Sequence, residues 1–436
     1  MKLGVVGLGR VGLVTAVCFA EKGFIVFGMD KDREKIEKLK DKEVPFFEPN
    51  LAELLRKNYD RLVFTDSIKE ITENCEVIFL CVGTPSLPDG RADLSQVEDV
   101  SREIAKNLNK FTLIVEKSTV PVKTAEWIKR IMSLYAKKDV TYEVASNPEF
   151  LREGSAVKDF LEPDRIVVGV ESEKSKKIFE KIYEGFNAPI IFTDIETSEI
   201  IKHASNAFLA MKISFINMIS DLCEKTGADI LKVSEAMGLD KRIGREFLNA
   251  GVGYGGSCFP KDVKAFYKIG EELGLDFSLL KCVDKINESR IDRFIEKIKR
   301  VLWIIKDKTF AVWGLSFKPG TDDVREAPSI KIVRRIIEEK GFCRVYDPYA
   351  MENFKREFLG CDRIYYAKDP YDAVKGANAI LVITEWDEFR NLDFKKIKEL
   401  METPIIIDGR NCLDVNKICE LNFIYIPTGR KVCGYL

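Results

Sequence analysis

Strand–helix alternation occurs twice in this 436-residue chain, and it constrains the possible fold more than any other feature. Short apolar runs rich in β-branched residues alternate with charged segments of helical spacing. Strands joined by helical crossovers run parallel, so each stretch predicts a doubly wound α/β sheet. The expected strands are 3–7, 25–30, 77–82, 113–117, 144–146 and 165–170 in the first stretch, and 309–315, 343–347, 379–384, 404–408 and 423–426 in the second.

The middle of the chain has a different period. From 198 to 226 the apolar residues step by three and four, which predicts one long helix, and more helix is expected to about residue 300. The apolar face of the long helix carries Ile201, Phe208, Phe215 and Leu222. Such a face usually packs against other domains or a second subunit, so a homodimer or a higher homo-oligomer is expected. The predicted domains are 1–197, 198–300 and 301–436.

Composition excludes several classes of function. Lys and Arg total 69 against 70 Asp and Glu, which argues against a nucleic-acid-binding surface. No apolar run approaches the ~20 residues of a membrane helix. The N-terminus also lacks the layout of a signal peptide. The sequence therefore predicts a soluble, cytoplasmic protein with neither nucleic acid nor membrane as a partner.

The eleven cysteines include no Cys-x-x-Cys pair, so a disulfide framework or a structural zinc site is not expected. Most of these thiols should be small buried residues. The one histidine, His203, is expected to pack internally or to lie on the surface. No metal site is predicted, and acid–base chemistry is left to Lys, Asp, Glu and Cys side chains.

The first expected strand runs into Gly7-Leu8-Gly9-Arg10-Val11-Gly12. In a dinucleotide-binding turn the first glycine makes the tight turn, the second admits a pyrophosphate, and the third lets the helix pack on the strand. The next expected strand ends at Asp30, whose carboxylate can bind an adenosine ribose, and Lys35 could reach the same ribose. This pattern predicts a Rossmann-like domain that prefers NAD to NADP. A glycine turn without a ligand is the alternative.

Small polar residues follow two further expected strands, with Thr84 after one and Thr119 after the other. Ligands of open α/β sheets lie beyond the carboxyl ends of the strands, so both threonines could touch a cofactor. Ordinary turn chemistry is the alternative.

Two pairs of polar residues could carry acid–base chemistry. Asn147-Pro148 is typical of a helix start, which would place Glu149 and Glu153 one turn apart on one helical face. The alternative is that these acids only favour a helix N-terminus. On the long helix, Lys202 and Asn206 lie one turn apart and off the apolar face. They could hold a substrate oxygen, or they could form a solvated face.

The most specific segment is 251–262, which begins with four glycines in six residues. Glycines this dense let a backbone wrap closely around a ligand. Cys258 stands where a helix is about to begin, with Lys261 and Asp262 one turn on. A helix N-terminus and a nearby ammonium both stabilise a thiolate. Cys258 is therefore predicted to be the reactive cysteine.

Together these residues resemble the UDP-glucose/GDP-mannose dehydrogenase family, in its UDP-glucose branch. The resemblance covers nearly the whole chain, from 7–12 to 408–411. It implies two Rossmann-like domains joined by a central helical region with one long helix. It also implies that the primary alcohol of UDP-glucose is oxidised to UDP-glucuronate by two NAD+-dependent hydride transfers, through a cysteine thiohemiacetal and thioester. Its most specific segments are 147–154, 163–169, 253–262, 314–329 and 384–389.

The resemblance implies roles for residues at matching positions. The implied catalytic residues are Cys258, Lys202, Asn206, Asp262, Glu153 and Thr119. The implied cofactor-binding residues are Gly7, Gly9, Val11, Gly12, Asp30, Lys35, Thr84, Thr119, Glu149, Lys261 and Arg325. The implied substrate-binding residues are Glu149, Phe150, Leu151, Arg152, Glu153, Lys202, Asn206, Phe247, Leu248, Asn249, Ala250, Gly251, Gly255, Lys318 and Arg410, with Arg242 offered to the substrate of a neighbouring subunit.

Two positions depart from the family's pattern: Asn50 stands where the family usually has Gly, and Met218 where it usually has Glu. Three other functions remain as alternatives. One is a sister dehydrogenase for a UDP-N-acetylhexosamine or GDP-mannose, and another is a two-electron β-hydroxyacid dehydrogenase. The third is a sensor that binds NAD and a nucleotide sugar without turnover. The last two have no use for a nucleophile at Cys258.

Overall fold

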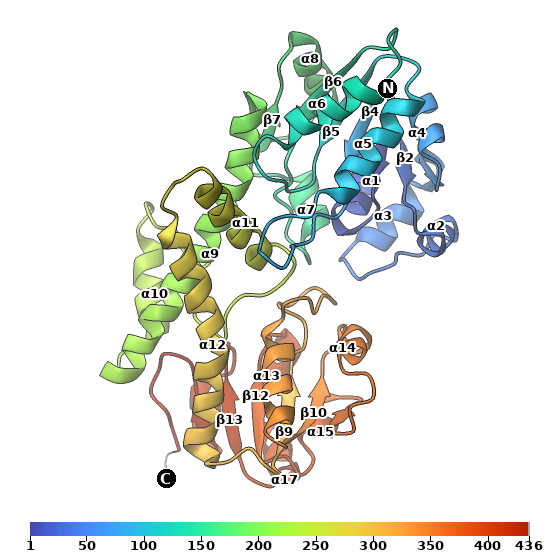
Figure 1. Ribbon diagram of the computed structural model, residues 1–436. Coiled ribbons are helices and arrows are strands. Elements are labelled where there is room, and N and C mark those ends of the chain that lie inside the picture. Colours follow the sequence, from blue (N-terminus) through green and yellow to red (C-terminus); the bar gives the residue numbers. More distant parts are fainter. Residues whose placement is uncertain (435–436) are drawn as a thin grey trace. The chain divides into compact units, whose positions relative to one another are not determined.

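The computed structural model describes residues 1–434. The chain forms two compact units (Figure 1). The first contains Met1–Ser205 and Lys268–Leu275, and the second contains Asn206–Tyr267 and the chain from Asp276 onward. The predicted fold class is confirmed, since an α/β sheet with covering helices forms each end of the sequence and a long helix lies between them.

The first unit is built on an eight-stranded sheet of order β3-β2-β1-β4-β5-β6-β7-β8. Neighbouring strands are parallel except β6 and β7, which pair antiparallel through Ser146 and Gly169. The central strand β4 is buried along its whole length, as expected for a strand covered on both faces. The strands are β1 (Lys2–Val6), β2 (Ile25–Met29), β3 (Leu62–Thr65), β4 (Val77–Leu80), β5 (Thr112–Glu116), β6 (Tyr142–Ser146), β7 (Ile166–Gly169) and β8 (Ile190–Thr193).

Two apolar clusters cover the two faces of this sheet. Because side chains alternate along a strand, Val5 of β1 joins one cluster and Val6 joins the other. Helices α1, α3, α7 and α8 contribute to the first cluster, and α4, α5 and α6 to the second. The helices are α1 (Arg10–Glu21), α2 (Arg33–Lys40), α3 (Leu51–Lys57), α4 (Ile68–Asn74), α5 (Ser95–Asn107), α6 (Thr124–Tyr135), α7 (Ala156–Leu161) and α8 (Glu173–Ile182).

The predicted long helix is α9 (Ile195–Thr226), of 32 residues. Three side chains of its predicted apolar face, Phe208, Phe215 and Leu222, are exposed in the single chain. Three more helices follow: α10 (Ile230–Leu239), α11 (Phe259–Glu272) and α12 (Ser278–Leu302). The alternation of strands and helices is therefore interrupted where the sequence period changed.

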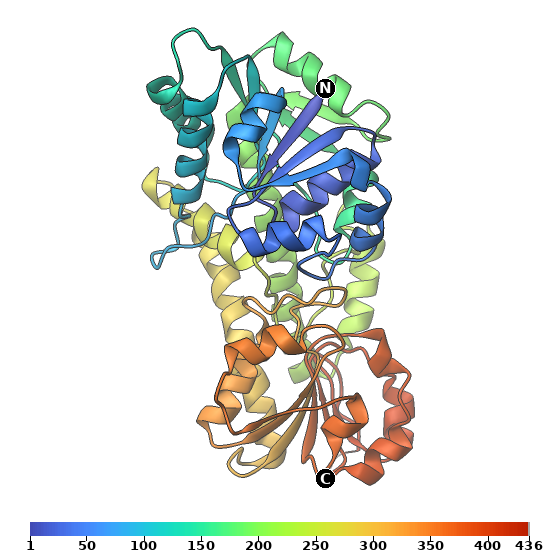
Figure 2. The same ribbon diagram turned by 90° about the vertical axis from the view of Figure 1, so that its right-hand side faces the viewer.

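The second unit contains a six-stranded, wholly parallel sheet of order β11-β10-β9-β12-β13-β14, with helices on both faces (Figure 2). Its strands are β9 (Thr309–Trp313), β10 (Phe342–Tyr346), β11 (Ile364–Tyr366), β12 (Ala379–Val382), β13 (Ile405–Asp408) and β14 (Ile424–Ile426). Its helices are α13 (Pro328–Glu338), α14 (Met351–Glu357), α15 (Pro370–Val374), α16 (Asp387–Arg390), α17 (Phe394–Leu400) and α18 (Val415–Glu420).

The sequence analysis did not predict strands β3, β8 and β11. All three are edge strands of their sheets. Strands β8 and β11 are also short and partly exposed. Each of the three has only three or four residues, and apolar runs this short cannot be assigned to a strand by their period alone.

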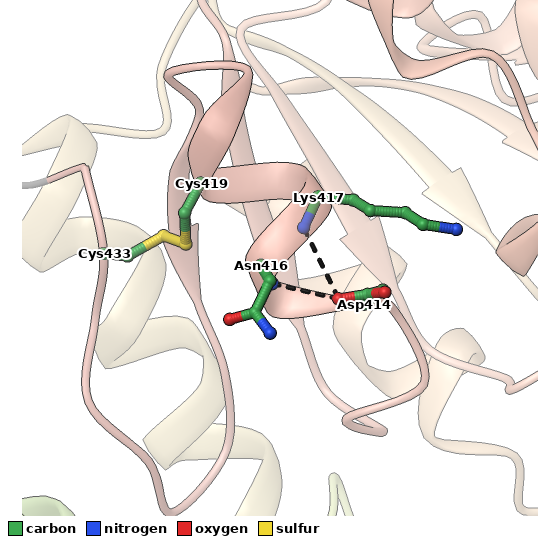
Figure 3. The surroundings of a disulfide bond; sticks show 5 residues. All are labelled: Asp414, Asn416, Lys417, Cys419 and Cys433. Carbon is green, nitrogen blue, oxygen red and sulfur yellow. Dashed lines mark hydrogen bonds between the residues drawn. A yellow bond between two sulfur atoms is a disulfide. The ribbon is translucent and has the colours of Figure 1, made fainter.

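One disulfide, between Cys419 and Cys433, departs from the expectation of free thiols (Figure 3). It ties α18 to the segment after β14, where Tyr425 and Cys433 also exchange backbone hydrogen bonds. The same segment lies on the central helices, because Gly429 N donates to Glu224 Oε1 at 2.9 Å. The other nine cysteines are free, and five of them are buried.

Residues 1–434 contain neither a candidate membrane span nor a candidate metal cluster. No helix in that range is long and apolar enough to cross a membrane. No group of three or more His, Cys, Asp and Glu side chains there could hold a metal ion.

Candidate active site

In the glycine turn between β1 and α1, the first and third glycines have no room for a side chain, whereas the middle one faces open space. Gly7 has φ of 91°, and a Cβ there would lie 2.7 Å from the carbonyl oxygen of Cys81. A Cβ on Gly12 would lie 1.8 Å from the carbonyl oxygen of Gly7, so only glycine lets α1 approach this closely. A Cβ on Gly9 would meet nothing within 4 Å. The N-terminus of α1 is therefore open at Gly9, and the pyrophosphate of a dinucleotide fits there.

Asp30 follows β2 directly and is fixed by three donors. Its Oδ2 accepts a hydrogen bond from Leu8 N at 2.8 Å, and its Oδ1 accepts one from Asp32 N at 3.0 Å. Lys35 Nζ lies 2.7 Å from Oδ2. The carboxylate and the ammonium thus stand together at the strand end, where a ribose hydroxyl can bind to both.

The two predicted threonines lie on loops that are bonded to each other. Thr84 Oγ1 donates to the carbonyl oxygen of Thr119 at 2.8 Å. Ser118 Oγ donates to the carbonyl oxygen of Val82 at 2.8 Å. The loops after β4 and β5 are therefore joined at the carboxyl ends of these neighbouring strands, the same edge as the glycine turn.

Lys202 and Glu149 form a buried ion pair, with Nζ 3.0 Å from Oε1 and both side chains 5% exposed. Leu151 N donates to the other oxygen of Glu149 at 2.6 Å. The alternative of a solvated helix face is therefore wrong for Lys202. A buried ammonium beside a carboxylate can hold a substrate oxygen and stabilise negative charge on it.

A second buried lysine, Lys117, lies close to this pair, and the sequence analysis did not single it out. Its Nζ donates to Asn147 Oδ1 at 3.2 Å. Burial lowers the pKa of Lys117 to about 8, although the nearby Cys81 and Glu149 act in the opposite direction. This ammonium therefore adds a second positive charge beside Glu149 at neutral pH.

The expected helix start at Asn147 is wrong, because residues 147–155 form a loop and the helix begins at Ala156. The side chain of Asn147 is occupied elsewhere: Nδ2 donates to Val167 O at 2.8 Å, and Oδ1 accepts from Lys117 and Tyr183. Glu149 and Glu153 consequently do not share a helical face. Glu149 pairs with Lys202, whereas Glu153 lies 3.7 Å from Nε of Arg10, on the first turn of α1 beside Val11.

Buried Glu48 fixes this loop, and the sequence analysis missed it. Its two carboxylate oxygens accept hydrogen bonds from Gly154 N at 2.7 Å and Ala156 N at 2.8 Å. The neighbouring Asn50 has φ of 65°, in the left-handed region. Asparagine tolerates that region better than most residues, which explains why it can stand where the family usually has glycine.

The segment 251–262, which contains Cys258, lies in the second unit. Cys258 precedes the first residue of α11, and its carbonyl oxygen accepts Asp262 N at 2.8 Å. Asp262 is fully buried; Asn206 Nδ2 donates to its Oδ2 at 2.6 Å, and Lys261 Nζ lies 2.7 Å from its Oδ1. Cys258 is half-buried, and Ser257 Oγ lies 3.6 Å from its Sγ. The helix start predicted at this cysteine is confirmed.

The glycines before Cys258 allow a close approach of other parts of the chain. A Cβ on Gly255 would lie 2.4 Å from the carbonyl oxygen of Glu326, and one on Gly256 would lie 2.8 Å from the ring of Phe317. Gly251 is likewise covered by Gly409 and Arg410. At these positions glycine lets the loop pack closely against the C-terminal part of the chain.

The predicted substrate segment 247–251 forms a partly buried loop that leads into these glycines. Phe247 has φ of 64°, and its ring centroid lies 6.0 Å from that of Phe259. Leu248 and Ala250 are buried, and Arg245 donates to Asn249 Oδ1 at 2.6 Å. Gly251 N donates to Oδ1 of Asn217 on α9 at 2.7 Å. Asn217 was missed because a single amide on an apolar helix gives no signal in the sequence.

Four predicted cationic residues lie in loops of the second unit. Arg410 Nε donates to the carbonyl oxygen of Ile383 at 2.7 Å, and Arg325 pairs with Asp323 at 2.5 Å. Lys318 Nζ lies 5.7 Å from the ring centroid of Phe317. Arg242 is exposed and pairs with Asp240 at 2.6 Å. On the first unit, Arg152 pairs with Asp159 at 2.6 Å, and the ring of Phe150 lies 3.9 Å from the guanidinium of Arg165.

Models of three protein domains match the chain. The NAD-binding domain of the UDP-glucose/GDP-mannose dehydrogenase family matches residues 1–187, its central domain matches 196–289 and its UDP-binding domain matches 311–415. The chain belongs to the UDP-glucose/GDP-mannose dehydrogenase family. It is therefore an NAD-dependent dehydrogenase, and the open glycine turn lies in its NAD-binding domain.

Relatives within the UDP-glucose/GDP-mannose dehydrogenase family cover the full length of the chain. A UDP-glucose 6-dehydrogenase of Bacillus subtilis is 45% identical over 99% of this chain and 98% of its own length. A UDP-glucose 6-dehydrogenase of Rhizobium meliloti is 44% identical over 99% of this chain and 100% of its own length. Among solved structures, a UDP-glucose dehydrogenase of Pyrobaculum islandicum matches with a TM-score of 0.91 at 37% identity, covering 99% of this chain and 98% of its own. A UDP-D-ManNAc dehydrogenase of Pyrococcus horikoshii matches with a TM-score of 0.86 at 28% identity, covering 99% of each chain.

Proposed function

We propose that this dehydrogenase oxidises UDP-glucose to UDP-glucuronate, with Cys258 as the nucleophile that links two oxidations. The observation that carries the proposal is the position of Cys258 at the start of α11, one turn before Lys261 and Asp262. An enzyme that stopped at the aldehyde would have no use for a nucleophile there. The UDP-glucose 6-dehydrogenases that resemble the chain along its whole length support the choice of sugar.

In the first oxidation, the C6 hydroxyl of glucose loses a proton and a hydride to become an aldehyde. Bound NAD+ supplies the chemistry of hydride acceptance. The ammonium of Lys202, fixed by Glu149, favours the oxyanion that develops as the proton leaves. Asn206, held by Asp262, adds a hydrogen-bonding amide one helical turn away on α9.

In the second oxidation, the Cys258 thiolate forms a C–S bond to the aldehyde carbon, and the carbonyl electron pair becomes an alkoxide. Loss of a second hydride from this carbon gives a thioester. Water then attacks the thioester and breaks the C–S bond, which yields the carboxylate and frees the thiol. We assign Glu153 to proton transfer from this water and Thr119 to holding it.

Cations and backbone groups of the second unit are assigned to the nucleotide. Lys318 and Arg410 offer positive charge to the UDP pyrophosphate without making the chain basic overall. The remaining substrate contacts are assigned to Glu149, Phe150, Leu151, Arg152, Phe247, Leu248, Asn249, Ala250, Gly251 and Gly255. The remaining cofactor contacts are assigned to Gly7, Gly9, Val11, Gly12, Asp30, Lys35, Thr84, Lys261 and Arg325.

We also propose a homodimer or a higher homo-oligomer formed through the exposed apolar face of α9, with Arg242 reaching the partner's substrate. The exposure of Phe208, Phe215 and Leu222 supports an apolar interface on this helix. Domain boundaries at 1–197, 198–300 and 301–436, and action in the cytoplasm, belong to the same proposal.

The test is a panel of nucleotide sugars with NAD+, in which NADH is followed by absorbance. UDP-glucose should be oxidised with two NADH formed per sugar. The second candidate function is oxidation of a UDP-N-acetylhexosamine in place of UDP-glucose, because a UDP-D-ManNAc dehydrogenase shares the fold at 28% identity. Turnover of N-acetyl sugars without turnover of UDP-glucose would contradict the choice of substrate.

A further inference from the structure

We propose that Glu199 and His203 are positioning residues that hold the loop between β5 and α6 against α9, with Glu116 as the neutral partner of the Glu199 carboxylate. The loop, residues 117–123, carries Thr119, and α9 carries Lys202. The inference rests on the proposed roles of Thr119 and Lys202. It adds a reason why these two residues keep one relative position.

Glu199 caps a helix that has no cap of its own. Residue Lys123, which precedes α6, has φ of 77° and makes no side-chain cap. Instead, Lys123 N donates to Glu199 Oε2 at 2.6 Å and Ala125 N donates to Oε1 at 3.1 Å. The carboxylate therefore bridges α9 to the start of α6, where the helix dipole also favours an anion.

His203, one turn further along α9, holds the same loop. Its Nε2 lies 2.6 Å from the carbonyl oxygen of Val120, the residue after Thr119. His203 is 1% exposed. Lys202 stands between these two anchors in sequence, so the helical turn that carries the ammonium also binds the loop at Val120 and at its end.

Glu116 completes the arrangement. It is the last residue of β5 and is 2% exposed. Among residues 1–434, no group donates to either of its oxygens, and the group that faces it is the carboxyl of Glu199. Burial and the Glu199 carboxylate raise the pKa of Glu116 well above its usual range. Glu116 therefore keeps its proton and can donate it, while Glu199 remains the anion that the two N–H groups bind.

The other charged groups nearby leave this assignment unchanged. Burial raises the pKa of Glu199 and Glu196 adds to the rise, but the N–H groups of Ala125 and Lys123 oppose it. The ammonium of Lys117, next to Glu116 in sequence, is directed to Asn147. One proton shared between two buried carboxyls is the expected state of such a pair.

The test compares Glu199→Gln, Glu116→Gln and the control Glu143→Gln in the full-length enzyme. Glu143 lies on the next strand, β6, and also holds a helix start, by accepting hydrogen bonds from Ser172, which caps α8, and from Ser175 within it. Displacement of a catalytic group by about 1 Å can cost about 100-fold in rate. We expect Glu199→Gln to lower kcat by roughly 10- to 100-fold and to raise the KM for NAD+. Glu116→Gln, which keeps a donor, should stay within about twofold of the parent kcat, as should Glu143→Gln.

A second readout needs no sugar, so it separates this inference from the proposed substrate. In Glu199→Gln, hydrogen exchange at the amides of Lys123 and Ala125 should be faster by about tenfold, the equivalent of one lost cap. The inference is overturned if exchange there and the kinetics both match those of Glu143→Gln. If the parent failed to oxidise UDP-glucose but exchange was faster in Glu199→Gln, the proposed substrate would be wrong. The proposal that Glu199 holds the loop against α9 would then be retained.

Glu116→Gln remains informative if Glu199→Gln does not fold. The native state binds a proton at Glu116 that the unfolded state has released above pH ~4.3, so parent stability falls as pH rises from there toward the raised pKa. The amide of Glu116→Gln does not titrate. The variant should therefore gain stability relative to the parent as pH rises from 5 to 8. A difference in unfolding free energy that does not change with pH would contradict the shared proton.

Discussion

At the scale of single residues, the role proposed for Cys258 predicts that its loss stops the reaction before the acid. Cys258→Ala removes the nucleophile but leaves Lys202, Asn206 and Asp262 in place. Formation of uronate should fall by several orders of magnitude, as in other nucleophile deletions, while reduction of added aldehyde by NADH should survive. The measurement is uronate formed per sugar, with mass spectrometry of the intact protein for an adduct.

The exposed Cys282 offers a matched control for that experiment. Cys282→Ala should form uronate and NADH at the parent rate. Near-normal acid production by Cys258→Ala would rule out the covalent route even if UDP-glucose proved to be the substrate.

The cofactor preference proposed for Asp30 is testable at the same scale. Its carboxylate would repel the 2′-phosphate of NADP+, although Lys35 lies 2.7 Å away and reduces that repulsion. We expect Asp30→Ala to lower the ratio of kcat/KM for NAD+ to that for NADP+ by about tenfold, the equivalent of one lost hydrogen bond to a charged group. Asp32→Asn, which alters the neighbouring helix cap, is the control and should leave the ratio unchanged. A parent enzyme equally efficient with both cofactors would contradict this role.

At the scale of elements, both sheets have a glycine turn after one strand and an aspartate after the neighbouring strand, but the two aspartates have different surroundings. Gly7 after β1 and Gly314 after β9 have φ of 91° and 89°. An aspartate follows the neighbouring strand in each case, Asp30 after β2 and Asp347 after β10. Asp347 accepts hydrogen bonds from four backbone N–H groups and from the indole of Trp386, and it is 1% exposed. The carboxylate of Asp347 is therefore bound by protein donors and stabilises the fold.

The disulfide is the other feature of this scale with a measurable consequence. It closes a separation of 14 residues, and cross-linking a loop of that length stabilises a protein by about 3 kcal/mol in the chain-entropy account. Replacing Cys419 and Cys433 by Ser should lower the free energy of unfolding by about that amount, measured in denaturant. A reducing agent should have the same effect on the parent and none on the variant. Equal stability of parent and variant would contradict the estimate.

At the scale of the whole molecule, the exposed face of α9 predicts association. Phe208 is 57% exposed and Leu222 is 60% exposed. Obligate homodimers bury roughly 2,000 Å² or more of mainly apolar surface, and such a face suits one. Light scattering at micromolar concentration should give at least a dimer, and Phe215→Lys with Leu222→Lys should shift it to the monomer. Leu359→Lys, at a leucine that lies off α9 and is 77% exposed, is the control. A fully active parent monomer would refute both the dimer and the shared role of Arg242.

The sequence by itself determined the layers of the fold and the chemical identity of the groups. Buried parallel strands need continuous apolar runs, and a long helix needs a period near 3.6, so both were visible as patterns. The glycine turn was visible because local backbone geometry demands glycine there. Asp30 and Cys258 were singled out by their places at the end of a strand and at the start of a helix.

Only the tertiary structure decided which polar groups meet. Asn147 was expected to cap a helix, but bonds to Val167 and Lys117 take its side chain into the interior. Glu149 was expected beside Glu153, and it pairs instead with Lys202, 53 residues away. Glu116 and Glu199 gave no local signal, since one acid at the end of a strand means nothing until a second is folded against it. Side-chain pairing over long separations depends on the packing of distant elements, and no local pattern of residues encodes it.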